Sequence, residues 1–136
     1  MRAERRFLID LRKGSVMTRS HVPNAIDYVE FPVSGADALA QTESFFSQVF
    51  GWGYKNWGDS YADTTDSGVG SGLTVASAAS PRQPLVVIYS DDLAATRTKI
   101  LDAGGTITCD TFPFPGGRRF HFKEPSGVEL AVWSDR

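Results

Sequence analysis

The sequence predicts an α+β fold made of two copies of a βαβββ unit within one domain. A strand-like stretch followed by a helix-like stretch occurs twice, at residues 25–50 and again at 85–105. Three short strand-like segments, separated by glycine, proline and aspartate, follow each helix. The length of 136 residues, with 41% hydrophobic and 22% charged side chains, suits one soluble domain that has its own core.

The first unit begins at residues 25–33, "AIDYVEFPV", where side chains alternate with the period of a half-buried strand. A helix is expected over residues 37–50, because its large apolar side chains fall on one side, and Gly51 can end it. Short strands are expected at residues 53–57, 59–65 and 70–77.

After a linker rich in serine and proline, the second unit repeats this order. Residues 85–90, "LVVIYS", are typical of a short buried strand. The helix that follows can be capped by Asp91 or Asp92 and ended by Gly104. The remaining strands are expected at residues 106–112, 118–123 and 128–133, joined by the turns "PFPGG" and "EPSG".

The first 24 residues differ from the rest, because arginine is frequent and the apolar patch "FLIDL" is short. A secretory signal needs an apolar stretch of about 7 to 15 residues. We therefore expect residues 1–24 to form a flexible basic arm, with Met17 as a second candidate start. The domain is expected at residues 25–136, with module one at 25–76 and module two at 84–135.

Composition excludes several classes of function. The net charge is −2 and no basic stripe stands out in the body of the chain, which argues against a nucleic-acid-binding protein. No apolar run approaches the roughly 18 residues that span a bilayer. Cys109 is the single cysteine, so no internal disulfide can form, and we expect it to be a structural residue. These features predict a cytoplasmic protein that binds neither nucleic acid nor membrane.

Five segments between residues 26 and 134 carry a family resemblance: "YVEFPVSG", "SFFSQVFGW", "GVGSGL", "DDLAATRTKILDAGG" and "FHFKEPSGVELAVW". In this order and spacing, the chain resembles the vicinal oxygen chelate superfamily, also called the glyoxalase, bleomycin-resistance and extradiol dioxygenase superfamily. It is most similar to a bacterial group described as enzymes related to lactoylglutathione lyase. The resemblance implies one glyoxalase-like domain whose two incomplete barrels line a small-molecule cavity, in a homodimer.

The resemblance also implies where metal-dependent relatives bind a divalent ion. Those positions fall on Tyr28, Leu85 and Ala131. Leucine and alanine have no donor atom, and a neutral tyrosine is a poor ligand for Mg, Mn, Ni or Zn. We therefore expect no metal or other cofactor. An alternative is a shifted site with two carboxylates and one histidine, made of Glu30, His121 and Glu129.

Alternation along the strands selects side chains that would face the cavity. In the last strand, positions 129, 131 and 133 are expected to face it, and positions 130 and 132 to face away. In the preceding strand, Arg119 and His121 alternate with two phenylalanines that we expect to pack under a helix. The candidate substrate-binding residues are Tyr28, Tyr89, Arg119, Glu129 and Trp133.

Glu30 and His121 are the candidate catalytic residues. A carboxylate within a strand is either paired or at a wet cavity, so Glu30 is either a general base or an ion-pair partner of Arg119. His121 suits acid–base catalysis at neutral pH, or is a strand histidine satisfied by the backbone or by Glu30. An inward Arg119 would hold a carboxylate or a phosphate.

Three functional interpretations stay open. The first is a metal-independent enzyme of lyase or isomerase type that acts on a small anionic or carbonyl-bearing substrate. The second is a bleomycin-resistance-type protein that sequesters a ligand without chemistry. The third is a metal-dependent lyase or dioxygenase with the shifted ligands. "GVGSGL" is not a phosphate loop, because it lacks the lysine followed by serine or threonine.

Overall fold

The computed structural model describes residues 9–10, 15–16, 21–78 and 80–136. The helices are α2 (Ala36–Phe50) and α3 (Leu93–Asp102). The strands are β1 (Ile9–Asp10), β2 (Ser15–Val16), β3 (Ile26–Val33), β4 (Lys55–Asn56), β5 (Tyr61–Thr64), β6 (Gly70–Val75), β7 (Leu85–Tyr89), β8 (Thr106–Phe114), β9 (Gly117–Lys123) and β10 (Glu129–Ser134). Apart from the short β1–β2 pair, most of the predicted basic arm, including Met17, lies outside the described residues.

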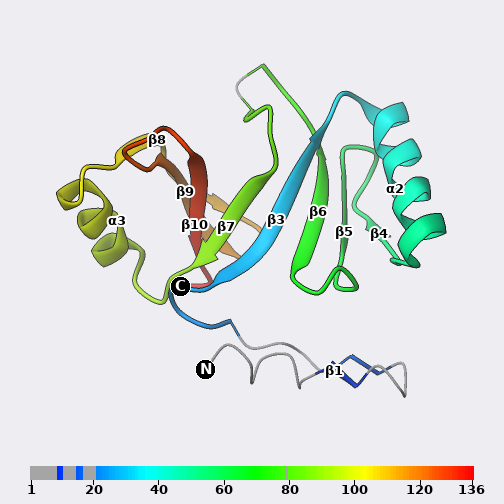
Figure 1. Ribbon diagram of the computed structural model, residues 1–136, viewed down its shortest axis with the longest axis horizontal. Helices are drawn as coiled ribbons and strands as arrows, with labels where there is room; N and C mark the ends of the chain where they lie inside the picture. Colours follow the sequence, from blue (N-terminus) through cyan, green and yellow to red (C-terminus); the bar gives the residue numbers. More distant parts are fainter. Residues whose placement is uncertain (1–8, 11–14, 17–20, 79) are drawn as a thin grey trace.

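Eight strands form one mixed sheet in the order β4-β5-β6-β3-β7-β10-β9-β8. In each half, the first strand pairs in parallel with the last, β3 with β6 and β7 with β10. The two halves join through antiparallel pairing of β3 with β7 at the middle of the sheet, as Figure 1 shows. The predicted α+β fold with two βαβββ units is therefore confirmed.

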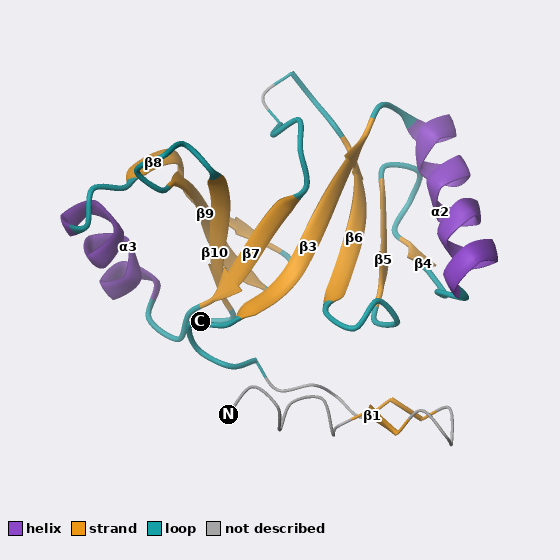
Figure 2. Cartoon of the chain, viewed as in Figure 1, coloured by secondary structure: helices purple, strands orange, loops and turns teal. Residues whose placement is uncertain are grey.

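The two helices lie at opposite ends of the sheet (Figure 2). Helix α2 packs on β3, β5 and β6, and α3 packs on β8 and β10. Leu39 anchors α2 in a cluster with Ala62 and Leu73, and Leu93 anchors α3 in a cluster with Phe120 and other residues of β9 and β10. We call the face that carries these clusters the helix face, and the opposite face of the sheet the open face.

Strand β10 shows the alternation that the sequence predicts. Leu130 and Val132 pack with the α3 cluster on the helix face. Ala131 and Trp133 pack instead with Leu85 and other residues on the open face. The predicted alternation of the last strand is thus confirmed, but Ala131 and Trp133, which were expected to face the cavity, do not line it.

The residues that the sequence predicts at two helix ends take those positions in the structure. Gly51 adopts the left-handed conformation that ends α2, with a φ of 75°. The side chain of Asp92 caps α3 by accepting a hydrogen bond of 3.0 Å from the backbone of Ala95. One strand differs, because β8 continues through Pro113 to Phe114 where a turn was expected. Strand β8 is at the edge of the sheet, where proline removes no hydrogen bond that the sheet needs.

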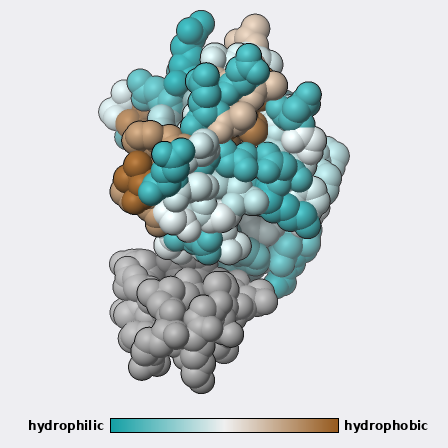
Figure 3. All heavy atoms as spheres, turned by 90° about the vertical axis from the view of Figure 1, so that its right-hand side faces the viewer, coloured by the Kyte–Doolittle hydropathy of each residue, from teal (hydrophilic) through white to brown (hydrophobic). Residues whose placement is uncertain are grey.

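Helix α2 leaves apolar side chains exposed at one end of the molecule. Phe45, Val49 and Phe50 are each more than half exposed. Figure 3 looks onto this end, and apolar atoms gather on one side of it. Among the described residues, no helix combines the length and the apolar character needed to cross a membrane.

Candidate functional site

A cavity of about 260 Å³ lies on the open face of the sheet. Its lining comes from strands β3, β6, β7, β8, β9 and β10 and from the linker between the two halves. The volume is just below the roughly 300–1,000 Å³ of ordinary ligand sites, which suits a small molecule. Its polar wall includes Glu30, Thr108, Arg119, His121 and Glu129.

Glu30 and Arg119, which both line this cavity, form a bidentate ion pair. The Arg119 Nη2 and Nη1 atoms donate to the two carboxylate oxygens of Glu30 at 3.0 and 3.2 Å. The side chains of Glu30 and Arg119 are 12% and 19% exposed. Strands β3 and β9 are three strand spacings apart, which is about 14 Å in a flat sheet. The sheet must therefore curve around the cavity for the pair to form.

This ion pair decides between the two interpretations of Glu30. Both oxygens of its carboxylate accept hydrogen bonds from Arg119, so the carboxylate fixes the position of the guanidinium. Glu30 lies in the cavity wall, where alternation predicts it, but as the partner of Arg119. The geometry favours the ion-pair interpretation.

His121 is a buried histidine with a nitrogen that has no partner. Its side chain is 8% exposed, and among the described residues Nε2 has no hydrogen-bond partner. Burial lowers the pKa of His121, and the positive charge of Arg119 lowers it further. The imidazole is therefore neutral at neutral pH, with one ring nitrogen able to accept a proton.

Arg119, like His121, has one unpaired nitrogen. Its Nε atom is buried and has no partner within the described part of the chain. Phe112 of β8 packs against both side chains, with its ring 5.4 Å from the guanidinium carbon of Arg119 and 5.8 Å from the ring of His121. Arg119 and His121, two alternate residues of β9, thus both line the cavity, and each has one buried nitrogen without a partner among the described residues.

The residues present do not fit the divalent metal that metal-dependent relatives bind. Leu85 and Ala131 lie in an apolar cluster. The hydroxyl of Tyr28 is hydrogen-bonded to that of Tyr61, and burial raises the pKa of Tyr28, so this phenol stays protonated. In the part of the chain that the structure describes, no group of three or more histidine, cysteine, aspartate or glutamate side chains can hold a metal ion. The shifted set of Glu30, His121 and Glu129 is therefore not such a group either. Its Glu129 instead accepts a hydrogen bond from Thr108 at 2.7 Å.

Tyr28 and Tyr61 occupy the open face beside Gly72 of β6. A Cβ atom at Gly72 would collide with both tyrosine hydroxyls. Burial raises the pKa of Tyr61 to about 12. Tyr28 does not line the cavity. It packs instead against the open-face cluster that contains Leu85.

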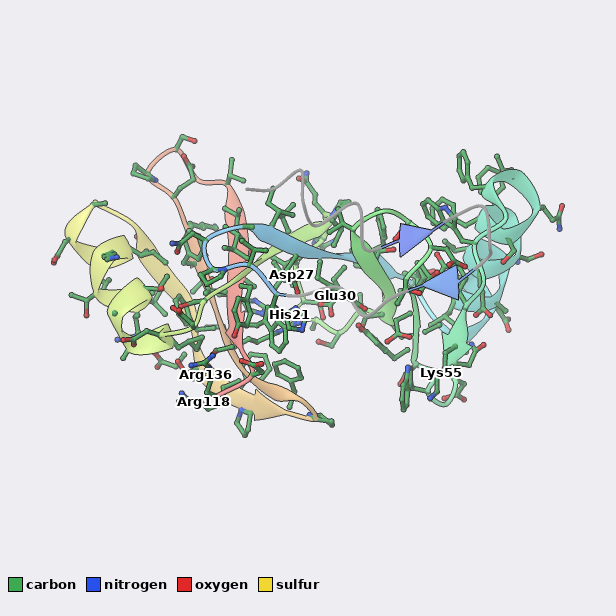
Figure 4. All side chains as sticks on the ribbon, turned by 90° about the horizontal axis from the view of Figure 1, so that it is seen from below. His21, Asp27, Glu30, Lys55, Arg118 and Arg136 are labelled. Carbon is green, nitrogen blue, oxygen red and sulfur yellow. The ribbon has the colours of Figure 1, made fainter. Side chains whose placement is uncertain are left out.

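Tyr89 and Trp133 lie away from the cavity and hold the start of the domain. The ring of His21 lies 5.1 Å from that of Tyr89 and 4.7 Å from that of Trp133. The buried Asp27 accepts hydrogen bonds of 3.1 Å from Trp133 Nε1 and from His21 Nδ1, and Figure 4 shows His21 beside Asp27. Neither Tyr89 nor Trp133 lines the cavity, and sequence reasoning missed their contacts with His21.

Sequence reasoning also missed part of the cavity wall. Cys109 and Phe112 line the cavity, although Cys109 was expected to be structural. The pairing of β8 with β9 shifts register on both sides of Cys109, so simple alternation does not predict its direction. Ser77, Ser80, Pro81 and Gln83 add a wall from the linker, for which serine and proline content gave no positional signal.

Comparison with known proteins agrees with this architecture. The chain matches the family model "Glyoxalase/Bleomycin resistance protein/Dioxygenase superfamily" over residues 25–132. No curated protein matches it.

Three solved structures share the fold at low sequence identity. A Mn(II)-bound glyoxalase from Novosphingobium aromaticivorans is 21% identical, with a TM-score of 0.61 over 83% of this chain and 39% of that one. A methylmalonyl-CoA epimerase from Mycobacterium tuberculosis is 14% identical, with a TM-score of 0.61 over 87% and 92%. A structure described as an NAD-dependent benzaldehyde dehydrogenase from Legionella pneumophila is 14% identical, with a TM-score of 0.63 over 79% and 96%. At these identities the similarity concerns the fold alone. With the family match over most of its length, the chain belongs to the glyoxalase/bleomycin resistance protein/dioxygenase superfamily.

Proposed function

We propose that the chain binds a small molecule with a carboxylate or carbonyl oxygen in the open-face cavity and that His121 exchanges a proton with it. One observation carries the proposal: two residues that line the same cavity, Arg119 and His121, each have a buried nitrogen, Nε and Nε2, that lacks a partner among the described residues. A buried polar atom left unpaired costs about 1–3 kcal/mol. A ligand whose oxygen accepts a hydrogen bond from Arg119 Nε, and which can give a proton to His121 Nε2, would remove that cost.

The roles within this site follow from the contacts. Glu30 holds the guanidinium of Arg119 in place, and Arg119 binds the ligand oxygen through its Nε–H group. His121 accepts a proton from a carbon next to the carbonyl and returns it, because its lowered pKa keeps it neutral. The reaction class is then a lyase or isomerase that needs no metal ion.

A second candidate function is ligand sequestration without chemistry. The ion pair between Glu30 and Arg119 favours this function. Glu30 is then not available as a second acid–base group beside His121. In both cases we propose that the protein is a cytoplasmic homodimer close to the group related to lactoylglutathione lyase. The segments "SFFSQVFGW" and "EPSG" support that finer placement.

Pyruvate and its neutral amide form a matched probe pair for this proposal. We expect chelator-treated protein to bind pyruvate at least about tenfold more tightly, because Arg119 carries the positive charge. Exchange of the methyl protons of pyruvate in D₂O, followed by NMR, should be faster with the protein than in buffer. Equal affinity for the acid and the amide would rule out the carboxylate alternative and leave the carbonyl alternative, and no binding of either compound would overturn the proposal.

Replacing His121 separates the two candidate functions. In His121→Gln, we expect exchange to fall by about 100-fold or more while pyruvate binding persists, since general bases contribute about 10²–10⁴-fold. If wild-type protein binds pyruvate and other small α-keto acids tightly but never accelerates exchange, the sequestration function is supported instead.

A further inference from the structure

Cys109 lies directly across the strand pair from His121. The two residues are register partners in the antiparallel pairing of β8 with β9. Partners of this kind place their Cβ atoms about 4.5–5.5 Å apart on one face of a sheet. Both residues line the cavity, so the thiol and the imidazole share one small space.

The position of Cys109 depends on an irregular strand. The register between β8 and β9 shifts between Ile107 and Cys109, and again between Cys109 and Phe112. Ile107 packs with the α3 cluster on the helix face, whereas Cys109 lines the cavity on the open face. A regular strand would send residues 107 and 109 to the same face. The irregularity therefore turns the thiol into the cavity.

His121 gives an independent reason to expect a ligand at this thiol. Its side chain is 8% exposed, and within the described residues its Nε2 has no partner. The only sulfur contact that the structure gives is from Cys109 Sγ to the backbone oxygen of Asp110, at 3.7 Å. That contact is weak, and Cys109 is a free thiol that keeps part of its surface exposed.

We propose that Cys109 is a nucleophile that captures a small α,β-unsaturated aldehyde or ketone in the cavity, with His121 as its proton acceptor. The sulfur attacks the β-carbon, so that a C–S bond forms while the C=C π bond breaks. The electron pair moves onto the carbonyl oxygen, which accepts a hydrogen bond from Arg119 Nε. His121 takes the thiol proton and returns it to the α-carbon. No group leaves, and no oxidant or reductant is needed.

This capture uses the same cavity as the proposed binding of carboxylates but a different chemical group. The unsaturated ligand needs no charge, because its recognition depends on the thiol and on one donor to its carbonyl oxygen. Pro32, Leu85 and Phe112 give that part of the cavity an apolar wall, which suits an uncharged carbon chain.

Methyl vinyl ketone is a suitable probe because Cys109 is the only cysteine of the chain. Intact-mass spectrometry of the full chain should show one adduct, and none in Cys109→Ser. At pH 7 we expect the native chain to react about ten times or more faster than the same chain unfolded in urea, where the cysteine is an ordinary thiol with a pKa near 8.5.

The role of His121 is tested by the pH profile. The native rate should rise with pH at values below 6.5, the ordinary pKa of histidine, because the pKa of His121 is lowered. In His121→Gln, the rate should follow only the ionisation of an ordinary thiol, rising steadily up to a pKa near 8.5. The native rate at pH 7 should then fall by about 10- to 100-fold, while the rate in urea stays equal to that of wild type.

Two results would overturn the proposal. One is a native rate no faster than the rate in urea, and the other is a native rate that His121→Gln leaves unchanged in a variant whose circular dichroism matches wild type. Pyruvate binding is scored separately. A chain that binds pyruvate while Cys109 reacts as an ordinary thiol loses only this inference, and a chain with the reverse behaviour loses only the proposed carboxylate site.

Discussion

Glu30 and Arg119 are two charged side chains that the fold keeps mostly away from water, at 12% and 19% exposure. Each alone would be costly to bury, and together they satisfy one another through two hydrogen bonds. The pair also joins β3 of the first half to β9 of the second, across the cavity. A single ion pair thus links Arg119, for which we propose a role in ligand binding, to the curvature of the sheet.

Replacing Glu30 by glutamine should destabilise the protein. In Glu30→Gln, the guanidinium of Arg119 keeps its charge but loses its carboxylate, and breaking a mostly buried pair costs roughly 2–4 kcal/mol. Urea unfolding measures this change in the free energy of unfolding. In the double variant Glu30→Gln/Arg119→Met, no buried charge is left alone, so part of the loss should be recovered. A Glu30→Gln variant as stable as wild type would contradict the description of the pair as buried and coupled.

The directions of single side chains were predictable where strands are regular. Leu130 and Val132 follow strict alternation, and the structure places both on the helix face. Cys109 does not, because the extra residue in its strand reverses the alternation and no sequence pattern marks it. His21 lay beyond any periodic segment, so its contact with Asp27 depends on tertiary structure alone.

Gly72 of β6 affects the packing of the open face because it has no side chain. Gly72 lies opposite Glu30 in the parallel pairing of β6 with β3. The absent side chain leaves room for the hydroxyls of Tyr28 and Tyr61, which meet above it. A glycine within a strand is typical of a close approach by another group, but nothing in the sequence indicates that tyrosine hydroxyls make the approach here.

Introducing a methyl group at Gly72 should therefore destabilise the protein. We expect Gly72→Ala to lower the free energy of unfolding by about 1–3 kcal/mol, because the tyrosines must move in a packed wall. Gly53→Ala is the matched control, since its Cβ would meet only Asp66 Oδ2 at an ordinary contact distance of 3.4 Å. Adding Tyr28→Phe to Gly72→Ala should restore part of the loss. If the two alanine variants unfold at the same urea concentration, the close packing at Gly72 is wrong.

The order of the elements and the ends of the helices were predictable because helix caps and strand alternation are local signals. Asp92 and Gly51 mark helix boundaries through chemistry contained in a few neighbouring residues. The position of a residue along the curved sheet is not local, since it depends on which strands pair and in what register. Tyr89 and Trp133 have the predicted parity, yet they lie beside His21 rather than at the cavity.

The two halves of the molecule share one sheet and one apolar cluster. Strand β3 of the first half pairs with β7 of the second from Ile26 to Glu30. The open-face cluster crosses the same boundary, because Tyr28 of β3 packs against the cluster of Leu85, Val87 and Ala131 in the second half. Neither half can unfold without exposing part of the other. The duplication visible in the sequence is therefore not expected to give two independent folding units.

Single-tryptophan variants can test this cooperativity. Trp133 reports on the second half and Trp52, which packs on Phe46 and Phe50, reports on the first. One variant keeps only Trp133 through Trp52→Phe and Trp57→Phe, and the other keeps only Trp52. In each variant, we expect the fluorescence midpoint in urea to coincide with the midpoint from far-ultraviolet circular dichroism, because β3–β7 pairing couples the halves. The comparison is made within one sample, so a change in stability caused by the substitutions moves both midpoints together. A fluorescence transition clearly separated from the loss of secondary structure in either variant would mean that one half unfolds first, and that the cavity between the halves opens before the fold is lost.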